Sequence, residues 1–237
     1  METLVRSPNR LLSNLVASDF ELVEPHLRDF PLEHAAVLAA AGEELKWAYF
    51  PHSGIISLVV RLMHGDTTEV AMVGKDSVFG ASAALIGPTA LTTAIVQSPG
   101  ISSALPIRSL YEAADRSKTF RVTLTRHEQA IFIQAQQSAA CNASHPARSR
   151  LARWLLRARD ASDSDDLFFT QEFLGQMLGM QRNAVPHVAS TLKEKGLIKF
   201  SRAQIRILDV AGLKAVACEC YETVKSELEQ LKRSSLH

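Results

Sequence analysis

The sequence predicts an α+β fold with an N-terminal antiparallel β-roll of the jelly-roll kind, a long helix and a C-terminal winged helix-turn-helix. Three observations predict it. Short segments of alternating, β-branched residues recur at close spacing between about residues 35 and 105. A helical segment without Gly or Pro follows over residues 117–142. Two short amphipathic helices about a glycine-containing turn, then two alternating strands, occupy residues 170–207.

The composition allows one large domain or two small ones. The chain has 237 residues, of which 46% are hydrophobic, enough for buried cores. No run approaches the roughly 20 apolar residues of a membrane helix, and the first residues lack the apolar stretch of a secretory signal. Three cysteines, Cys141, Cys218 and Cys220, do not make a disulfide framework. We therefore expect a cytoplasmic protein without membrane association.

The net charge of +1 conceals a difference between the two parts of the chain. Residues 1–140 hold 11 basic and 14 acidic side chains, whereas residues 141–237 hold 15 basic and 11 acidic ones. The front part therefore carries −3 and the back part +4. This asymmetry favours a sensing domain followed by a nucleic-acid-binding domain.

The front part alternates strands and turns after a helical start. Short helices are expected over residues 9–29, where Ser18 and Glu21 form a capping box. Strands rich in β-branched and aromatic residues are then separated by turns with Gly, Asp or Pro. The expected strands are 47–50, 55–61, 67–73, 92–96 and 101–105. Short strands at close, regular spacing predict a small antiparallel barrel or jelly roll.

The segment 117–142 predicts one long helix with a wide apolar face. Its main stripe consists of Phe120, Leu124, Ile131, Ala135 and Ser138. Phe132 and Ala139 broaden the stripe. A helix with so wide an apolar face usually packs on two partners at once. We interpret them as the β-roll and the same helix of a second subunit; the alternative is an ordinary long core helix.

The helix-turn-helix follows a helix over residues 147–161 and a polar connector over 160–166. Thr170 is a good N-cap for its first helix, and Gly179 ends that helix. The apolar face of the second helix is Val185, Val188, Ala189 and Leu192. The polar face is Arg182, Asn183, His187 and Ser190. Such a pair, with the second helix polar on its outer face, is typical of a major-groove reader.

A short hairpin, or wing, completes this domain before a last helix over residues 210–232. Its strands alternate through Ile198, Phe200, Ile205 and Ile207. From Arg182 to Arg206 there are six basic residues against one acid, Glu194. The alternative, a generic helical hairpin with a solvated face, is weakened by the wing and by this local charge.

This order of elements resembles the Crp/Fnr family of bacterial transcription regulators over nearly the whole chain. The matching stretches are Gly42-Glu43 before Tyr49-Phe50, Gly54, the segment from Gly74 to Gly80, CNASHPARSRLARWLL from Cys141, and T-Q-E-x-L-x-x-M-L-G-x-x-R from Thr170 with G-L-I behind it. The resemblance implies a cyclic-nucleotide-binding-like sensor domain (1–116), a dimerisation helix (117–145) and a winged helix-turn-helix DNA-binding domain (146–237). It also implies a homodimer on double-stranded DNA, with RNA polymerase as a further partner.

The sequence departs from the family pattern where cyclic nucleotides bind. Family members that bind them have a Gly-Glu pair and, about ten residues on, an Arg that neutralises the cyclic phosphate. Here Ala81 follows Gly80, and no Arg or Lys lies between Lys75 and Arg108. We expect neither cyclic AMP nor cyclic GMP to bind, and the effector is unknown. The candidate pocket residues are Gly80, Ala81, Thr92, Thr93 and Gln134.

The resemblance also assigns the DNA contacts. Arg182 matches the family's recognition-helix Arg, while Asn183 stands where many members have Glu and His187 where many have Arg. Pro186, about the fifth residue of the recognition helix, is expected to tilt or shorten its first turn. The expected DNA-binding residues are Thr170, Gln171, Gln181, Arg182, Asn183, His187, Ser190, Lys193 and Arg202. A near-palindromic site with half-sites one helical turn apart is expected.

Cofactor motifs of other family members are not found. No Cys precedes Cys141, so a four-cysteine iron–sulfur cluster of the N-terminal type is not expected. His52, His64 and His127 are available as haem ligands, but a lone His among turns is more often a surface residue. His52 and His64 also lack the His-x-His spacing of metal-binding cupins.

The cysteines and the other reactive side chains likewise do not indicate a metal, a cofactor or a catalytic site. Cys141 is a redox switch or, more commonly for a helical Cys, an inert buried residue. Cys218-x-Cys220 is interpreted as too close for zinc alone and without a partner pair. No nucleophile–base or paired-carboxylate arrangement stands out. We therefore expect the protein to bind no metal and no cofactor and to have no enzymatic activity. The alternatives are a cupin-like metalloenzyme with an appended helical domain and a DNA-binding structural protein without a sensing role.

Overall fold

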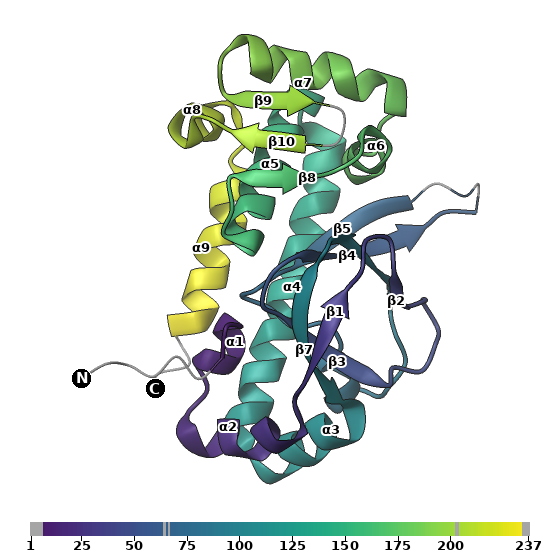
Figure 1. The fold of residues 1–237 in the computed structure, drawn as a ribbon, viewed down its shortest axis with the longest axis vertical. Helices are drawn as coiled ribbons and strands as arrows, with labels where there is room; N and C mark the ends of the chain where they lie inside the picture. Colours follow the sequence, from purple (N-terminus) through teal and green to yellow (C-terminus); the bar gives the residue numbers. More distant parts are fainter. Residues whose placement is uncertain (1–6, 64, 66, 202–203, 234–237) are drawn as a thin grey trace. The chain divides into compact units, whose positions relative to one another are not determined.

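The computed structural model describes residues 7–63, 65, 67–201 and 204–233 (Figure 1). The chain forms two compact units. Of the described residues, those within 7–57 and 73–131 belong to unit 1, and those within 58–72 and 132–233 belong to unit 2. In the described parts of the chain, no helix combines the length and the hydrophobicity that a membrane span requires. The predicted α+β class, with antiparallel strands, a long helix and a C-terminal helix-turn-helix, is confirmed.

Two sheets carry the strands of the front part. The three-stranded sheet is antiparallel, in the order β1 (Arg28–Leu32), β7 (Gly100–Pro106) and β3 (Trp47–Pro51). The four-stranded sheet has the order β2 (Val37–Ala39), β6 (Thr93–Ser98), β4 (Ile55–Arg61) and β5 (Thr67–Val73). In the first sheet Phe30 pairs with Ser102 and Tyr49 with Ala104, and the two aromatic rings pack edge to face at 5.0 Å.

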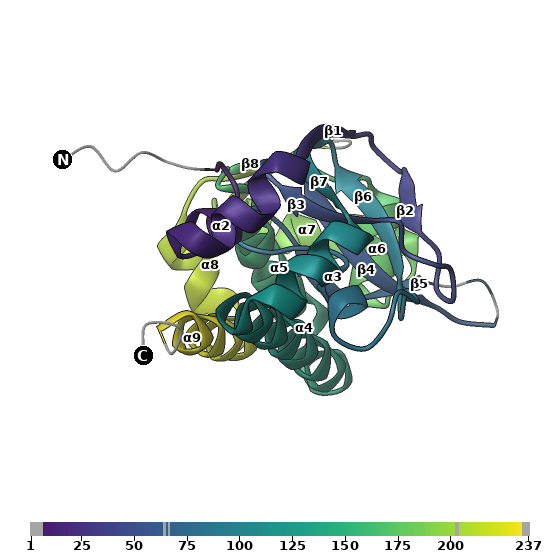
Figure 2. The same ribbon diagram turned by 90° about the horizontal axis from the view of Figure 1, so that it is seen from below.

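Helices close one side of unit 1. They are α1 (Arg10–Ser13), α2 (Ala17–Val23), the 3₁₀ turn η1 (Glu24–His26), α3 (Ile107–Arg116) and the start of α4 (Lys118–Ser144). Figures 1 and 2 show α2 and α3 near one another, and the two helices are in contact. Their apolar residues share one buried cluster with Phe50 and Leu105 of the sheet, and Phe120 and Leu124 of α4 belong to the same cluster. The first turns of α4 are thus anchored in the core of unit 1.

The capping box predicted at Ser18 is wrong. α2 begins at Ala17, and its N-cap Val16 makes no side-chain capping bond. The carboxylate of Asp19 instead accepts hydrogen bonds from Ser117 Oγ at 2.6 Å and Thr119 Oγ1 at 2.7 Å. Ser117 Oγ in turn accepts from the backbone N–H of Phe120 at 3.2 Å. Asp19 therefore links α2 to the junction of α3 and α4, although it lies about 100 positions from its partners in the sequence.

Unit 2 contains the helix-turn-helix and its wing. Besides residues 58–72 and the end of α4, it contains α5 (Ala147–Ser162), β8 (Asp166–Phe168), α6 (Gln171–Leu178), the 3₁₀ turn η3 (Arg182–Ala184), α7 (Val185–Glu194), β9 (Ile198–Ser201), β10 (Gln204–Ile207), α8 (Val210–Val216) and α9 (Cys220–Arg233). The strands form a sheet in the order β8-β10-β9. Ile205 of β10 lies between Leu167 of β8 and Phe200 of β9, and all the ladders are antiparallel.

Two expectations for unit 2 are corrected. The polar connector predicted over residues 160–166 ends in β8. There Asp166 pairs with Arg206 in the β-ladder, and the two side chains form an ion pair with 3.4 Å between Arg206 Nε and Asp166 Oδ1. The single last helix predicted over 210–232 is two helices, α8 and α9, separated by Ala217–Glu219. The break places Cys218 and Cys220 at the corner between the two helices.

Candidate functional site

The first helix of the motif is fixed at both ends by its own sequence. Thr170 Oγ1 accepts a hydrogen bond from the N–H of Phe173 at 3.1 Å, which caps α6 as predicted. Gly179 follows the helix with a φ of 56°, a left-handed conformation that glycine adopts without steric cost. Arg150 of α5 donates to the carbonyl of Leu178 at 2.7 Å, so a cation also satisfies the C-terminal end.

An aromatic cluster holds α6 against α5. The ring of Trp154 packs edge to face on Phe169 at 4.5 Å and on Phe173 at 5.6 Å. The indole N–H of Trp154 donates to the buried carboxylate of Glu69 at 2.7 Å. Large buried rings with a satisfied polar atom make a stiff support. The motif therefore sits on a rigid base within unit 2.

The second helix begins later than the sequence indicates. Residues 182–184 form η3, and α7 starts at Val185, so that Pro186 lies in its first turn. In that position the missing N–H of proline costs no helical hydrogen bond. From the sequence alone, a Pro at the fifth helical position would break a backbone hydrogen bond with Arg182; because α7 begins at Val185, that expectation is wrong. Arg182 and Asn183 belong to the 3₁₀ turn ahead of α7.

The faces of η3 and α7 differ in the way a groove reader requires. Val185, Ala189 and Leu192 are completely buried. Among the predicted DNA contacts, Thr170, Gln181, Asn183, His187 and Lys193 are exposed, and Gln171 and Ser190 are half-buried. The hydroxyl of Ser190 donates to the Pro186 carbonyl at 2.8 Å, a bond within the helix. The structure gives no description of the Arg182 side chain, and Arg202 lies outside the described residues.

Lysines extend the exposed polar face. Lys193 and Lys195 close α7, and Lys199 projects from β9; all three side chains are exposed. Arg206 differs from them because its ion pair with Asp166 offsets its charge. A cationic surface next to an exposed polar face is the electrostatic footprint of a nucleic-acid contact.

The predicted effector residues have structural partners. Gly80 has a φ of 96°, and a Cβ there would lie 3.2 Å from the Cα of Ala48, so close packing on β3 requires glycine. Thr93 Oγ1 accepts from the N–H of Ala41 at 3.1 Å. In unit 2, Gln134 accepts from the N–H of Met72 at 3.4 Å. Ala81 is buried and Thr92 half-buried. The effector pocket stays a prediction.

Several residues of the predicted dimer stripe are buried inside their own chain. Phe120 and Leu124 have no exposed surface, and Ser138 is buried as well. Side chains that are buried within their own chain are not available to a second copy. Ile131 and Ala135 are half-buried. By contrast, Phe132, which broadened the predicted stripe, is 62% exposed.

The histidines considered as haem or cupin ligands have other roles where the structure describes them. His127 is buried, and its Nε2 lies 3.2 Å from the N–H of Val78 and 3.0 Å from Ser77 Oγ. His52 Nε2 lies 2.8 Å from Ser103 Oγ, and burial lowers the pKa of His52. His64 lies outside the described residues.

The cysteines form a group that sequence reasoning missed. The expectation that Cys218 and Cys220 lack a partner pair is wrong, because Cys141 and His145 lie beside them. A hydrogen bond from Cys218 is the main cause that lowers the pKa of the Cys141 thiol to about 5. The sequence signals that point to this group are the spacings Cys141-x-x-x-His145 and Cys218-x-Cys220.

A family model matches the helix-turn-helix region, and solved structures resemble most of the chain in fold. Residues 149–216 match the family model of the Crp-like helix-turn-helix domain. No curated protein matches the chain. FixK2 from Bradyrhizobium japonicum is a similar solved structure, with a TM-score of 0.70, 19% identity, and coverage of 81% of this chain and 98% of that one.

Two further structures have the same fold. TTHB099, a CRP-family transcriptional regulator from Thermus thermophilus, has a TM-score of 0.64 and 23% identity over 80% of this chain and 96% of its own. CLP, a c-di-GMP-responsive global regulator from Xanthomonas campestris, has a TM-score of 0.66 and 13% identity over 82% of this chain and 100% of its own. The predicted resemblance to the Crp/Fnr family is thereby confirmed.

Proposed function

We propose that this chain, which carries a Crp-like helix-turn-helix domain on the fold of the Crp/Fnr regulators, is a homodimeric, sequence-specific DNA-binding transcription regulator. The observation that carries the proposal is the surface of η3 and α7, polar and exposed outside and fully buried on the opposite side. Residues 1–116 act as sensor domain, 117–145 as dimerisation helix and 146–237 as DNA-binding domain. The protein is not an enzyme and works on cytoplasmic DNA, with RNA polymerase as a further partner.

An exposed heptad pattern along α4 supports the homodimer. Residues spaced alternately by three and four, all exposed, run along this 27-residue helix: Val122, Thr125, Gln129, Phe132, Gln136, Ala139 and Ala143. This is the spacing of a and d positions in a coiled coil. All seven side chains are uncharged, so the same stripe on a second copy meets no like charge across a two-fold axis. We call this set the α4 seam.

The exposed face of η3 and α7 indicates what kind of DNA the protein reads. Asn183 matches the two donor and acceptor groups that adenine presents in the major groove, whereas a Glu at that place accepts from cytosine. We therefore expect a half-site that differs from that of members with Glu. We expect Arg182 to contact a base edge or a phosphate, and Arg202 to contact a phosphate. A two-fold dimer reads a near-palindrome with half-sites roughly 34–36 Å apart.

Unbiased selection of bound duplexes from a random DNA pool tests the proposed function. We expect enrichment of an inverted repeat whose half-site centres are separated by about 10 base pairs. Enrichment of no motif, with retention that follows salt concentration alone, would show non-specific binding and overturn the proposal in favour of a structural DNA-binding protein. Repeating the selection with cell extract tests whether a small molecule changes the affinity.

Cyclic AMP and cyclic GMP should not bind to the sensor domain. No Arg or Lys between Lys75 and Arg108 replaces the cation that holds the cyclic phosphate in nucleotide-binding members. Titration calorimetry of the purified protein with each nucleotide should give only heats of dilution. Binding in the micromolar range would contradict this prediction and point to a cation from elsewhere in the dimer.

A further inference from the structure

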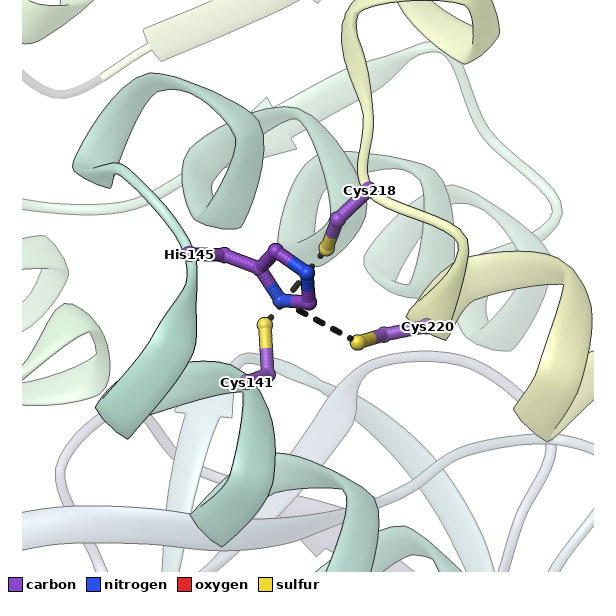
Figure 3. Close-up of side chains that lie close together, drawn as sticks. All are labelled: Cys141, His145, Cys218 and Cys220. Carbon is purple, nitrogen blue, oxygen red and sulfur yellow. Dashed lines mark hydrogen bonds between the residues drawn. The ribbon is translucent and has the colours of Figure 1, made fainter.

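Three cysteines and one histidine of unit 2 converge on a single point. Figure 3 shows Cys141 and His145 from the end of α4 facing Cys218 and Cys220 from the corner between α8 and α9. The ligand atoms of all four residues lie within 4.8 Å of one another. The Sγ atoms of Cys141 and Cys218 are 3.5 Å apart, as are Cys220 Sγ and His145 Nδ1.

Local structure explains why these residues meet. Cys141 and His145 are four positions apart at the end of α4, where the His145 N–H still donates to the Cys141 carbonyl at 3.0 Å. Side chains at that spacing lie on the same face of a helix. Cys218 and Cys220 are one residue apart where the chain turns into α9, and the Tyr221 N–H donates to the Cys218 carbonyl at 3.2 Å. Two short-range pairs are thereby brought together from distant parts of the sequence.

The surroundings of the group are those of metal ligands. The second ring nitrogen of His145, Nε2, lies 3.1 Å from the carboxylate of Glu219, so that Nδ1 is left to face the sulfur atoms. A carboxylate behind the histidine is the usual support of a metal-bound imidazole. Gln137 Nε2 donates to Cys220 Sγ at 3.0 Å, a bond that stabilises a thiolate. All three cysteines are buried and unpaired by disulfides.

We propose that Cys141, His145, Cys218 and Cys220 bind one Zn²⁺ ion. With Zn–S bonds of about 2.3 Å and Zn–N bonds of about 2.0–2.1 Å, a tetrahedral site separates its ligand atoms by about 3.6–3.8 Å. The two separations of 3.5 Å and the 4.8 Å limit for the whole group are close to that geometry. Thiolates with an imidazole suit zinc. An iron–sulfur cluster places several atoms between its cysteines and usually takes four of them.

The site has a structural role in unit 2. Four protein ligands complete the tetrahedron and leave no open position for a substrate, which is the arrangement of structural rather than catalytic zinc. The ion ties the corner between α8 and α9 to the end of α4. Because the four ligands are brought together only in the folded unit, zinc binds that unit more tightly than the unfolded chain and so adds to the stability of the part that carries the helix-turn-helix.

Elemental analysis of tag-free protein, purified from zinc-supplemented cells, tests the proposal. We expect one zinc per chain, and loss of that zinc in the Cys141→Ser and His145→Ala variants. His26→Ala, which removes an exposed histidine of unit 1, should keep it. If the variants do not fold, the unmodified protein still decides the question. After chelation it should take up one Co²⁺ per chain with the intense visible absorption of a tetrahedral thiolate site.

Three results would overturn the proposal. They are absence of zinc from the purified protein together with no uptake after chelation, iron with acid-labile sulfide at the site, and a weakly absorbing octahedral Co²⁺ spectrum. The test is independent of DNA binding, so failure of the DNA selection would leave it standing. Conversely, a protein without zinc that still selects a palindrome would retain the proposed function.

Removing the carboxylate behind His145 should weaken the site without abolishing it. Glu219→Gln leaves all four ligands in place and replaces the acceptor of the His145 Nε2–H bond by a neutral amide. We expect zinc affinity to fall about 10–100-fold, measured by competition with a chromophoric chelator, while the Co²⁺ spectrum stays tetrahedral. Glu222→Gln on α9, an exposed acid outside the site, is the matched control. Equal affinities of the two variants would exclude Glu219 from the support of His145.

Discussion

Phe132→Asp is expected to convert the protein from a dimer into a monomer. Phe132 is the only large aromatic side chain of the α4 seam and lies at its centre. A carboxylate there would be buried against its two-fold mate without a partner, a situation that costs several kcal/mol per charge. Because Phe132 is 62% exposed in the single chain, the change should leave the folding of each chain nearly intact. Sedimentation equilibrium checks the mass, and thermal unfolding checks the fold.

The same variant should lose most of its affinity for the selected palindrome. Two linked half-sites bind about 10²–10⁴-fold more tightly than one, so a monomer gives up that factor on a full site and little on an isolated half-site. Ile86→Asp, which places the same charge on an exposed apolar residue outside α4, is the control and should remain dimeric. A Phe132→Asp protein that sediments as a dimer with unchanged affinity would remove the α4 seam from the interface.

Asn183→Ala should weaken binding to the selected site and relax its sequence preference at one base pair. A side-chain amide on adenine discriminates by about 1–3 kcal/mol, which corresponds to roughly 5–150-fold in affinity. The loss should be small on a scrambled duplex, because non-specific binding rests on phosphate contacts. Titration of both duplexes at two salt concentrations measures the two effects separately. Asn183 is exposed in η3, so its removal creates no cavity.

Lys199→Ala is the contrasting variant. Its exposed ammonium on β9 is suited to a phosphate, so the variant should weaken both duplexes alike and reduce the salt dependence by about one charge. Lys46→Ala, an exposed lysine of unit 1, should change neither quantity. Equal losses on both duplexes for Asn183→Ala would make Asn183 a backbone contact. No loss for either variant would place the groove-reading surface elsewhere.

Much of the DNA-binding motif was predictable because its signals are local. The cap at Thr170 and the left-handed Gly179 depend on neighbours within one helical turn, and both are present in the structure. Period 3.6 identified the buried side of α7, where Val185, Ala189 and Leu192 have no exposed surface. The start of α7 was missed because η3 and a first helical turn look alike in sequence, and only the backbone places Pro186 where its lost N–H is harmless.

The helical pattern of residues 117–142 indicates a wide apolar surface on α4, whereas the packing of distant elements shows which part of that surface is covered. Phe120 and Phe132 are equally apolar in a helical pattern. The first is buried in the core of unit 1 because α1, α2 and the sheet surround it, and the second remains exposed. Burial depends on elements that are distant along the chain. The helical periodicity therefore identifies the apolar residues of α4 but does not show which of them are buried.

The cysteine–histidine group also depends on the packing of distant segments. Its composition and its two short spacings are present in the sequence, and each pair alone has an ordinary explanation. Cys141 and Cys218 are 77 positions apart, and they meet because α8 ends at Val216 and the chain turns before α9. Local chemistry specifies each half of the site, whereas the meeting of the halves follows from how the helices of unit 2 pack. A site assembled from two distant segments therefore became visible only in three dimensions.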